Sequence, residues 1–168
     1  MSLASFHYAF ESRDELMAEL VAYVVEEQER AIQPVLAVAG GGITMRDAIR
    51  AGLQSYLEVV RENPLREKAM FELTHYAMRS PGLEATAKRQ YAAYYSLAER
   101  TLQAAADRAR TTWALPTSEI ATLLVALTDG LTLSWLVNRD DAAAASIIDF
   151  AADSLASLAR SHHIQRTA

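Results

Sequence analysis

The sequence predicts an all-α fold, a helical bundle, and three observations carry that prediction. Apolar side chains recur at helical spacing along most of the chain, and no segment shows the apolar–polar alternation of a half-buried strand. Capping residues, prolines and glycines punctuate the chain at intervals that suit helices. The chain has 168 residues, 51% of them hydrophobic, with only 6 glycines and 4 prolines. That length suits one domain with a sizeable core.

The first predicted helix begins at a capping box and ends at a glycine run. In the sequence Ser12-Arg13-Asp14-Glu15, the Ser12 hydroxyl is expected to accept a hydrogen bond from the backbone amide of Glu15. The Glu15 side chain is expected to accept one from the backbone amide of Ser12. The apolar face continues to about Val38, and Gly40-Gly41-Gly42 then ends the helix. Thr44 and Asp47 open the second predicted helix.

Two proline junctions predict the next helix starts. Asn63-Pro64 caps a shorter helix that runs to about Arg79, since a proline at N1 loses no hydrogen bond. Ser80-Pro81 repeats the device and predicts the longest helix, which runs to about Arg110. After a break at residues 113–116, two further helices are expected at about 118–138 and 141–161.

These last two helices carry more apolar surface than one subunit is expected to cover. The helix at 118–138 is apolar nearly all round, whereas a surface helix shows a polar face. The run Ala142–Ala145 lets helix axes approach closely. We therefore predict a homodimer with a four-helix interface, with simple core burial as the alternative. The predicted interface residues are Leu124, Val125, Thr128, Thr132, Ile147, Phe150, Ala151, Leu155 and Leu158.

Composition excludes several classes of protein. The absence of cysteine excludes a disulfide framework and a thiolate metal site. The apolar stretch 120–137 has Asp129 at its centre, which would cost roughly 2.5–3.5 kcal/mol at mid-bilayer, so a buried soluble helix is favoured over membrane association. No signal peptide opens the chain, and we expect a cytoplasmic protein. The net charge of −5 lacks the basic footprint of a DNA-binding domain, so that footprint is absent, local or outside the chain.

The N-terminal segment resembles part of the TetR family of transcriptional regulators. Residues 2–16 are similar to the second helix of the helix-turn-helix and the start of the helix that follows it. The matching residues are Phe6, Tyr8, Phe10, Ser12, Arg13 and Leu16. His7 and Ala9 depart from the family pattern, which most often has aromatic or bulkier residues there. The order of the later helices also looks like the family's regulatory body.

The resemblance implies two parts and a DNA contact surface. Residues 1–12 would be a remnant of the helix-turn-helix domain, and residues 13–168 an effector-binding and dimerisation domain. The recognition helix of such a domain enters the major groove. The candidate contacts with operator DNA are Ser2, Ser5, His7 and Tyr8, with Arg13 near the DNA backbone.

Family members have two further helices before this segment. The chain as given is therefore not expected to bind an operator with useful affinity, whereas a version extended upstream is. Met1 is a misassigned start, the boundary of an expressed fragment or a true truncation, and the sequence leaves these alternatives open.

The resemblance also implies a pocket for a small apolar or amphipathic effector whose binding releases DNA. Aromatic and methionine side chains give adaptable walls, and hydroxyl or imidazole groups orient a ligand. For each candidate, ordinary core packing is the alternative. The candidates are Tyr56, Met70, Phe71, His75, Met78, Tyr91, Tyr94, Tyr95, Leu127, Asp129, Leu131 and Trp135.

Asp129-Gly130 interrupts the most apolar helix. In one interpretation, Gly130 permits a close helix crossing and Asp129 has a partner. Asp129 either meets a cation, a hydroxyl or the ligand, or it points into solvent at the pocket mouth. A buried carboxylate needs a partner, so this residue is the most informative one in the predicted pocket.

The expected function is a ligand-responsive transcriptional regulator, with no cofactor and no enzymatic activity. One alternative is a dimerising helical sensor or interaction module without DNA binding. A di-metal helical-bundle enzyme is a weaker alternative, because the Glu-x-x-His spacing of Glu72 and His75 occurs without the second copy that such a site uses. The effector, the operator sequence and the choice between repressor and activator are not determined by the sequence.

Overall fold

The computed structural model describes residues 13–38 and 43–161. The predicted all-α class is confirmed, with helices forming nearly all of this part of the chain. The elements in chain order are α2 (Arg13–Val38), α3 (Met45–Glu62), α4 (Pro64–Arg79), α5 (Glu84–Ala109), β1 (Thr111–Trp113), α6 (Thr117–Asn138), α7 (Asp141–Ala156) and β2 (Ala159–Ser161).

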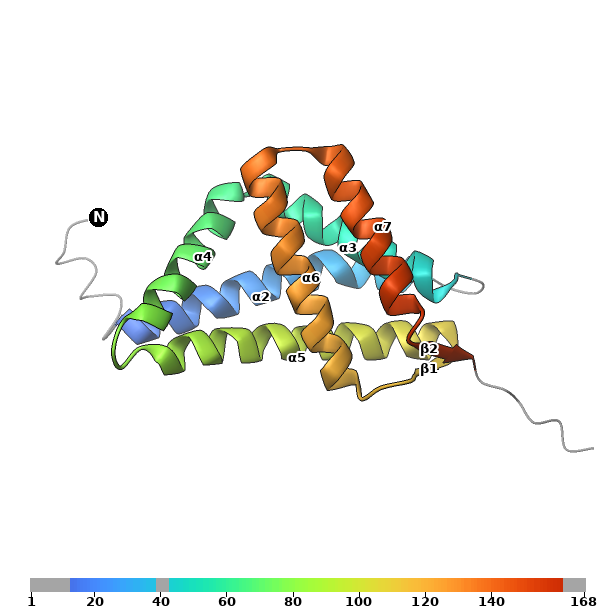
Figure 1. The fold of residues 1–168 in the computed structure, drawn as a ribbon. Coiled ribbons are helices and arrows are strands. Elements are labelled where there is room, and N and C mark those ends of the chain that lie inside the picture. Colours follow the sequence, from blue (N-terminus) through green and yellow to red (C-terminus); the bar gives the residue numbers. More distant parts are fainter. Residues whose placement is uncertain (1–12, 39–42, 162–168) are drawn as a thin grey trace, which may run out of the picture.

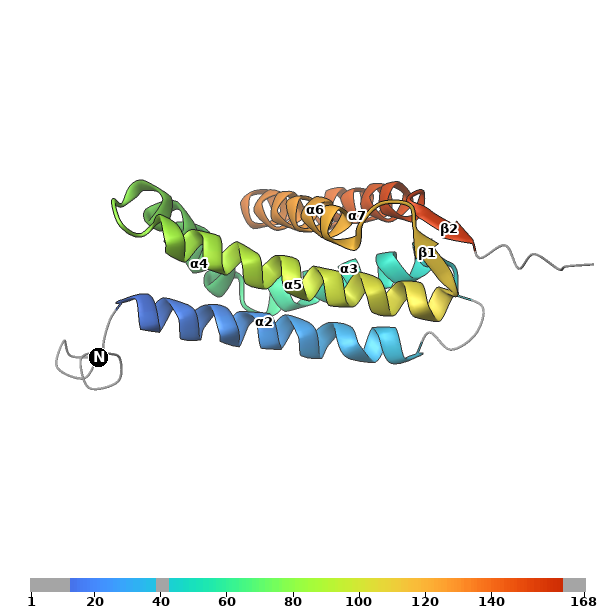
Figure 2. The ribbon, with the colours of Figure 1, turned by 90° about the horizontal axis from the view of Figure 1, so that it is seen from below.

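The helices form three layers. Helices α6 and α7 lie side by side as one outer layer, and α2 forms the opposite outer layer (Figures 1 and 2). Helices α3, α4 and α5 lie between them, with α5 packed against both α2 and α6, and α3 against both α2 and α7. The beginning of α2 and the turn between α4 and α5 lie at the same end of the bundle in both views.

Two of the predicted helix starts are confirmed in atomic detail. The backbone N–H of Asp47 donates to Thr44 Oγ1 at 3.1 Å, which caps α3. The backbone N–H of Arg66 donates to Asn63 Oδ1 at 3.2 Å, and Pro64 occupies the first turn of α4. Each cap satisfies an amide that has no partner inside the helix.

The predicted helix start at Ser80-Pro81 is wrong. Ser80 ends α4, and α5 begins only at Glu84. Gly82 lies between them with φ of 87°, a left-handed conformation that a continuous helix does not contain. Its N–H donates to Glu84 Oε2 at 2.9 Å, so the turn is closed by a side chain of the following helix.

A short antiparallel pair of strands also corrects the sequence prediction. Strand β1 pairs with β2, with Thr112 opposite Arg160, whereas the sequence predicted no strand and a last helix that continued to residue 161. Arg110, at φ of 51°, ends α5 in a left-handed cap and redirects the chain. Strands of three residues are too short to show a period of two. The pair connects the end of α7 to the α5–α6 connection.

The hydrophobic core lies between α3, α5, α6 and α7. Its most deeply buried side chains include Val60, Ile120, Leu131 and Leu155, each at most 1% exposed. A second, smaller cluster joins Val21 and Val24 of α2 to Met70 of α4. Helix α2 also packs on α3 and α5, and Tyr94 contacts both clusters.

Helix α6 is long and apolar enough to cross a membrane, by length and composition alone. In the structure α5 and α7 both pack against it. Buried Thr132 and half-buried Asp129 lie on the same helix. These contacts are those of a helix that packs on its neighbours in a helical bundle.

Candidate functional site

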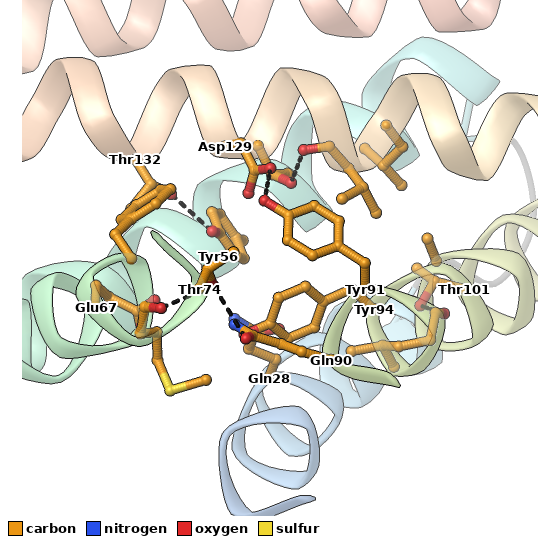
Figure 3. Close-up of a pocket in the computed structure, with 17 residues that line it drawn as sticks. Gln28, Tyr56, Glu67, Thr74, Gln90, Tyr91, Tyr94, Thr101, Asp129 and Thr132 are labelled. Carbon is orange, nitrogen blue, oxygen red and sulfur yellow. Dashed lines mark hydrogen bonds between the residues drawn. The ribbon is translucent and has the colours of Figure 1, made fainter. Parts of the chain in front are cut away.

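A cavity of about 90 Å³ lies among helices α2 to α6 (Figure 3). Its walls combine aromatic and aliphatic side chains with two carboxylates. The lining residues are Gln28 of α2, Tyr56 of α3, Glu67, Met70, Phe71 and Thr74 of α4, Gln90, Tyr91, Tyr94, Leu97, Ala98 and Thr101 of α5, and Leu124, Val125, Thr128, Asp129 and Thr132 of α6.

Helical spacing explains why α5 and α6 contribute most of the wall. On α5 the lining positions Gln90, Tyr94 and Thr101 fall at intervals of four and seven residues, which share one face of a helix. On α6, Val125 and Asp129 are likewise separated by four residues. Because α5 packs directly on α6, these two faces meet across the cavity.

A tyrosine–carboxylate pair forms the most polar part of the wall. The Tyr91 hydroxyl donates to Asp129 Oδ2 at 2.7 Å (Figure 3). Burial raises the pKa of Asp129 above its ordinary value, and the hydrogen bond from Tyr91 partly opposes this shift. Burial and the neighbouring carboxylate raise the pKa of Tyr91 as well, so its hydroxyl stays protonated and continues to donate.

The other polar groups of the wall bind each other. The hydroxyls of Tyr56 and Thr132 form a hydrogen bond of 2.6 Å. Thr74 Oγ1 donates to Gln90 Oε1 at 3.0 Å, and Gln90 Nε2 donates to the Tyr94 hydroxyl at 3.0 Å. Burial raises the pKa of Tyr94 to about 12. The tyrosines are thus neutral and already engaged within the protein.

An ion network lies where α2 meets the cavity. The Arg66 side chain is only 8% exposed, and it binds both Glu27 of α2 and Glu67 of α4. The Arg66 Nη2–Glu67 Oε1 distance is 3.0 Å. Burial raises the pKa of Glu67, and Arg66 opposes that shift. One arginine therefore links the helix α2 to a carboxylate in the cavity wall.

The structure gathers half of the sequence-predicted pocket residues around this cavity. The six that line it are Tyr56, Met70, Phe71, Tyr91, Tyr94 and Asp129. Tyr95 packs edge-on against Tyr91 with ring centroids 6.0 Å apart, and it lies outside the lining.

The remaining five candidates lie elsewhere. Leu131 and Trp135 are buried in the main core, and Leu127 packs against it. His75 and Met78 are exposed on α4. Trp135 donates from Nε1 to Asp141 Oδ1 at 2.9 Å, which fixes the indole near the α6–α7 connection.

Sequence reasoning missed most of the polar wall. Gln28, Glu67, Thr74, Gln90 and Thr101 line the cavity but were not candidates. A usable signal existed for α5, because Gln90 and Thr101 share a helix face with Tyr94. Gln28 and Glu67 can be recognised as lining residues only once the position of α2 relative to α4 is known. The sequence does not contain that information in a local pattern.

The faces of α6 differ from the sequence interpretation. Val125, Thr128 and Thr132 were predicted for a subunit interface together with Leu124, but all four line the cavity. On α7, Ala151 and Leu155 are buried inside the subunit, Ile147 and Leu158 pack against the core, and Phe150 is 65% exposed. The outward face of α6 instead carries Leu123, Leu133 and Val137. Of the predicted interface residues, the four that are buried inside the subunit have no surface left for a second copy: Val125, Thr132, Ala151 and Leu155. The interface prediction still applies to the half-buried and exposed ones, Leu124, Thr128, Ile147, Leu158 and Phe150.

The predicted DNA contacts fall outside the described residues, except for Arg13. Ser2, Ser5, His7 and Tyr8 precede the described part of the chain, and Arg13 is the first residue of α2. Within residues 13–38 and 43–161, no group of three or more His, Asp or Glu side chains is placed to hold a metal ion. Glu72 and His75, which carry the Glu-x-x-His spacing, are both exposed.

Comparison with known proteins identifies the family. Residues 45–160, more than half of the chain, match the family model of the C-terminal domain of BetI-type transcriptional repressors. Over 140 residues the chain is 26% identical to the nicotine-responsive helix-turn-helix transcriptional repressor HdnoR of Paenarthrobacter nicotinovorans. That match covers 83% of this chain and 70% of the relative.

Two solved structures share the fold. A TetR transcription regulator from Haloarcula marismortui aligns with a TM-score of 0.63 at 16% identity, covering 95% of this chain and 86% of the other. A structure described as a transcriptional regulator from Pseudomonas aeruginosa PAO1 aligns with a TM-score of 0.65 at 19% identity, covering 94% and 76%. The family-model match and these similarities show that the chain belongs to the TetR family of ligand-responsive transcriptional regulators, with a BetI-type C-terminal domain.

Proposed function

We propose that this chain is a homodimeric transcriptional repressor whose small-molecule effector binds in the cavity between α2 and α6. The observation that carries the proposal is the presence of a buried α2 side chain, Gln28, in the cavity wall. Helix α2 follows directly on residues 1–12, the segment that resembles a recognition helix. An occupant of the cavity therefore contacts the helix through which a DNA-binding segment would be moved.

The composition of the cavity supports a small organic effector. Tyr56, Phe71 and Leu97 supply apolar wall, and Asp129 supplies a polar contact. The relative HdnoR is named for its response to nicotine, itself a small organic molecule. Occupation of the cavity would shift the population between a DNA-binding and a released arrangement only if the ligand binds the two with different affinity.

The outward face of α6 and α7 supports the homodimer. Leu133, Val137 and Phe150 are 53%, 71% and 65% exposed on this layer. Large apolar side chains gathered on one face mark an interaction site more often than a free surface. Dimer formation through this layer would leave α2 on the far side, where a pair of DNA-binding segments would be held in a fixed relation.

DNA binding is proposed for residues 1–12, with Ser2, Ser5, His7, Tyr8 and Arg13 as contacts. The protein would act in the cytoplasm on operator DNA. The proposal includes the prediction that tight operator binding needs helices upstream of Met1. Titrating the 168-residue chain and an upstream-extended version against the same promoter DNA by fluorescence anisotropy tests it, and tight, sequence-selective binding by the shorter chain would contradict it.

The effector role is tested by filling the cavity. In the extended protein, Thr101→Phe places a ring in the cavity, whereas Ser96→Phe adds the same ring to an exposed position of α5. We expect both variants to bind promoter DNA, and we expect only Ser96→Phe to release it when the effector from a screen of small organic molecules is added. If the Thr101→Phe variant also released promoter DNA at the same effector concentration, the effector would bind somewhere other than this cavity.

A further inference from the structure

We propose that the connection between α3 and α4 couples the α6–α7 turn to α2, so that loosening the turn also loosens α2. This connection, residues 59–66, is called the α3–α4 junction below. It carries two arginines that bind opposite outer layers of the bundle (Figure 2). Arg66 binds α2, and Arg61 binds the first residue of α7.

The α3–α4 junction is short and held at both ends. A single residue, Asn63, separates the two helices. Its backbone N–H donates to the Val59 carbonyl at 3.4 Å, and its side-chain oxygen accepts from the backbone N–H of Arg66 at 3.2 Å. Pro64 restricts its own φ to the helical range, and Val60 is fully buried in the main core. A connection of this kind transmits a displacement of the end of α3 to the start of α4.

Arg66 attaches α2 to this junction. Its side chain is only 8% exposed, and it binds Glu27 of α2 and Glu67 of α4. Its Nη2 also donates to the Val59 carbonyl at 3.4 Å, so the last turn of α3 supplies one of its acceptors. A buried charge is stable only while its partners stay in place. A shift of this turn therefore weakens the contact between Arg66 and Glu27.

Arg61 attaches the same turn of α3 to the opposite layer. Its Nη2 donates to Asp141 Oδ1 at 2.5 Å, and its guanidinium carbon lies 5.9 Å from the centre of the Trp135 ring. The same Asp141 oxygen accepts from Nε1 of the buried Trp135 at 2.9 Å. An exposed ion pair alone contributes little. Here the acceptor is fixed by a buried indole and lies in the first turn of α7, where the helix dipole favours a carboxylate.

The coupling has a consequence that rests on the function proposed above. The α6–α7 turn belongs to the layer proposed as the dimer interface, and Val137 beside the turn is 71% exposed. A second copy packed on this layer would fix Asp141 and thereby hold α2, the helix that follows the proposed DNA-binding segment. Formation of the dimer would then restrict the motion of α2 even when the cavity is empty.

Hydrogen–deuterium exchange of the 168-residue chain, measured by mass spectrometry, tests the coupling. Asp141→Ala removes the acceptor shared by Arg61 and Trp135. We expect the amides of residues 22–31 in α2 to exchange faster by about threefold or more, because the last turn of α3 is released. A peptide from the middle of α5 reports the opening of the whole protein, and its exchange should rise less than that of α2.

The matched control breaks another ion pair between α3 and α7. Asp149 accepts from Arg50 Nε at 2.6 Å, and Arg50 lies nine residues before Val59 in the same helix. Asp149→Ala therefore removes a contact between the same two helices at a distance from the α3–α4 junction. We expect it to leave the exchange of α2 relative to α5 unchanged.

A second pair of variants tests the coupling in the reverse direction, since coupling between two sites is reciprocal. Glu27→Gln weakens the attachment of α2 to Arg66, and it should speed exchange of residues 138–145, at the α6–α7 turn, by about threefold or more. Glu29→Gln weakens the exposed pair with Arg100 between α2 and α5, and it should leave the turn unchanged.

Three outcomes would overturn the proposal: Asp141→Ala speeds exchange of α2 no more than that of α5, the two aspartate variants speed α2 equally, or Glu27→Gln leaves the turn unchanged. None of these measurements uses DNA or an effector, so the function proposed above would stand in each case. That function fails separately, if the Thr101→Phe variant of the extended protein still releases promoter DNA on addition of its effector.

Discussion

Asp129 combines a cost in stability with a candidate role in binding. In the folded protein its pKa is raised, mainly because burial disfavours the charged form. The folded state then holds the proton more tightly than the unfolded state, and the free energy of unfolding falls as the pH rises through these two pKa values. A residue that lowers stability at neutral pH is retained more readily where function needs it.

Replacement of this residue is therefore expected to stabilise the protein in a pH-dependent way. Asp129→Asn removes the desolvated charge and keeps an oxygen to accept from Tyr91. At pH 7 we expect the free energy of unfolding to rise, because the substitution removes a charge that burial disfavours. The gain should shrink toward zero as the pH falls to about 4, where the unfolded-state carboxyl also binds its proton. Urea unfolding at both pH values measures the difference.

A second aspartate, Asp149, provides a control, because its pKa is shifted in the opposite direction from that of Asp129. Arg50 holds the pKa of Asp149 below its ordinary value through a direct hydrogen bond. Asp149→Asn is expected to lower stability at pH 7, because the folded protein loses a favourable partner of the charge. A destabilised Asp129→Asn protein at pH 7, or equal effects of the two substitutions, would contradict this account.

At the scale of single residues, the sequence identified unusual residues within an apolar helix but did not identify the groups that they contact. Asp129 was singled out because a carboxylate interrupts an apolar helix, and both a hydroxyl partner and a solvent-facing position remained open. The structure supplies the hydroxyl of Tyr91, 38 positions away in the chain. Gly130 was expected to allow a close helix crossing, yet a Cβ built there meets nothing within 4 Å. Distances between helices are not encoded in local pattern.

At the scale of elements, α6 shows where pattern reasoning loses information. A helix that is apolar on every face has no stripe to mark its orientation, so its inward and outward faces are indistinguishable by periodicity. The sequence therefore predicted the existence of α6 correctly and assigned Val125 and Thr132 to an interface, while the structure turns them to the cavity. The helix starts at Thr44 and Asn63 were predictable because capping is local chemistry. The start of α5 was not predictable in this way. Gly82 adopts a left-handed conformation directly after Pro81, so the helix begins only at Glu84.

The attachment of α2 to the rest of the bundle gives a prediction at this scale. Arg66 is buried between Glu27 of α2 and Glu67 of α4. Removing one partner from a buried network leaves uncompensated charge, which typically costs 3–5 kcal/mol. Arg66→Met should therefore lower the free energy of unfolding by about that amount, measured by chemical denaturation, and hydrogen exchange should show α2 opening first.

A surface pair between α2 and α5 is the matched control. Arg100 binds Glu29 at 3.0 Å, with side chains 54% and 36% exposed. Exposed pairs contribute at most about 1 kcal/mol, so Arg100→Met should change stability little. Similar losses for the two arginine variants would mean that the buried network contributes no more than an ordinary surface contact.

At the scale of the whole molecule, α6 contributes both to the cavity proposed to bind the effector and to the surface proposed to form the dimer. One of its faces lines the cavity through Val125 and Thr132, and the opposite face is exposed through Leu123 and Val137. A ligand that shifts α6 would alter the outer layer, and one that shifts Gln28 would alter α2. The order of the layers thus places the cavity between a proposed dimer interface and the helix that follows the proposed DNA-binding segment.

The outer layer supplies the last prediction. Leu133 is 53% exposed on α6, and burying a leucine is worth about 1.5–3 kcal/mol relative to leaving it in water. In a symmetric dimer the same side chain is buried twice, and a carboxylate at that position would be desolvated in both copies. Leu133→Glu should therefore convert a dimer to monomer in analytical ultracentrifugation while circular dichroism stays helical. Leu65 is 76% exposed on α4, outside this layer, so Leu65→Glu should leave the dimer intact. A wild-type chain that sediments as a monomer, or a dimer that tolerates Leu133→Glu, would show that α6 and α7 do not join two subunits.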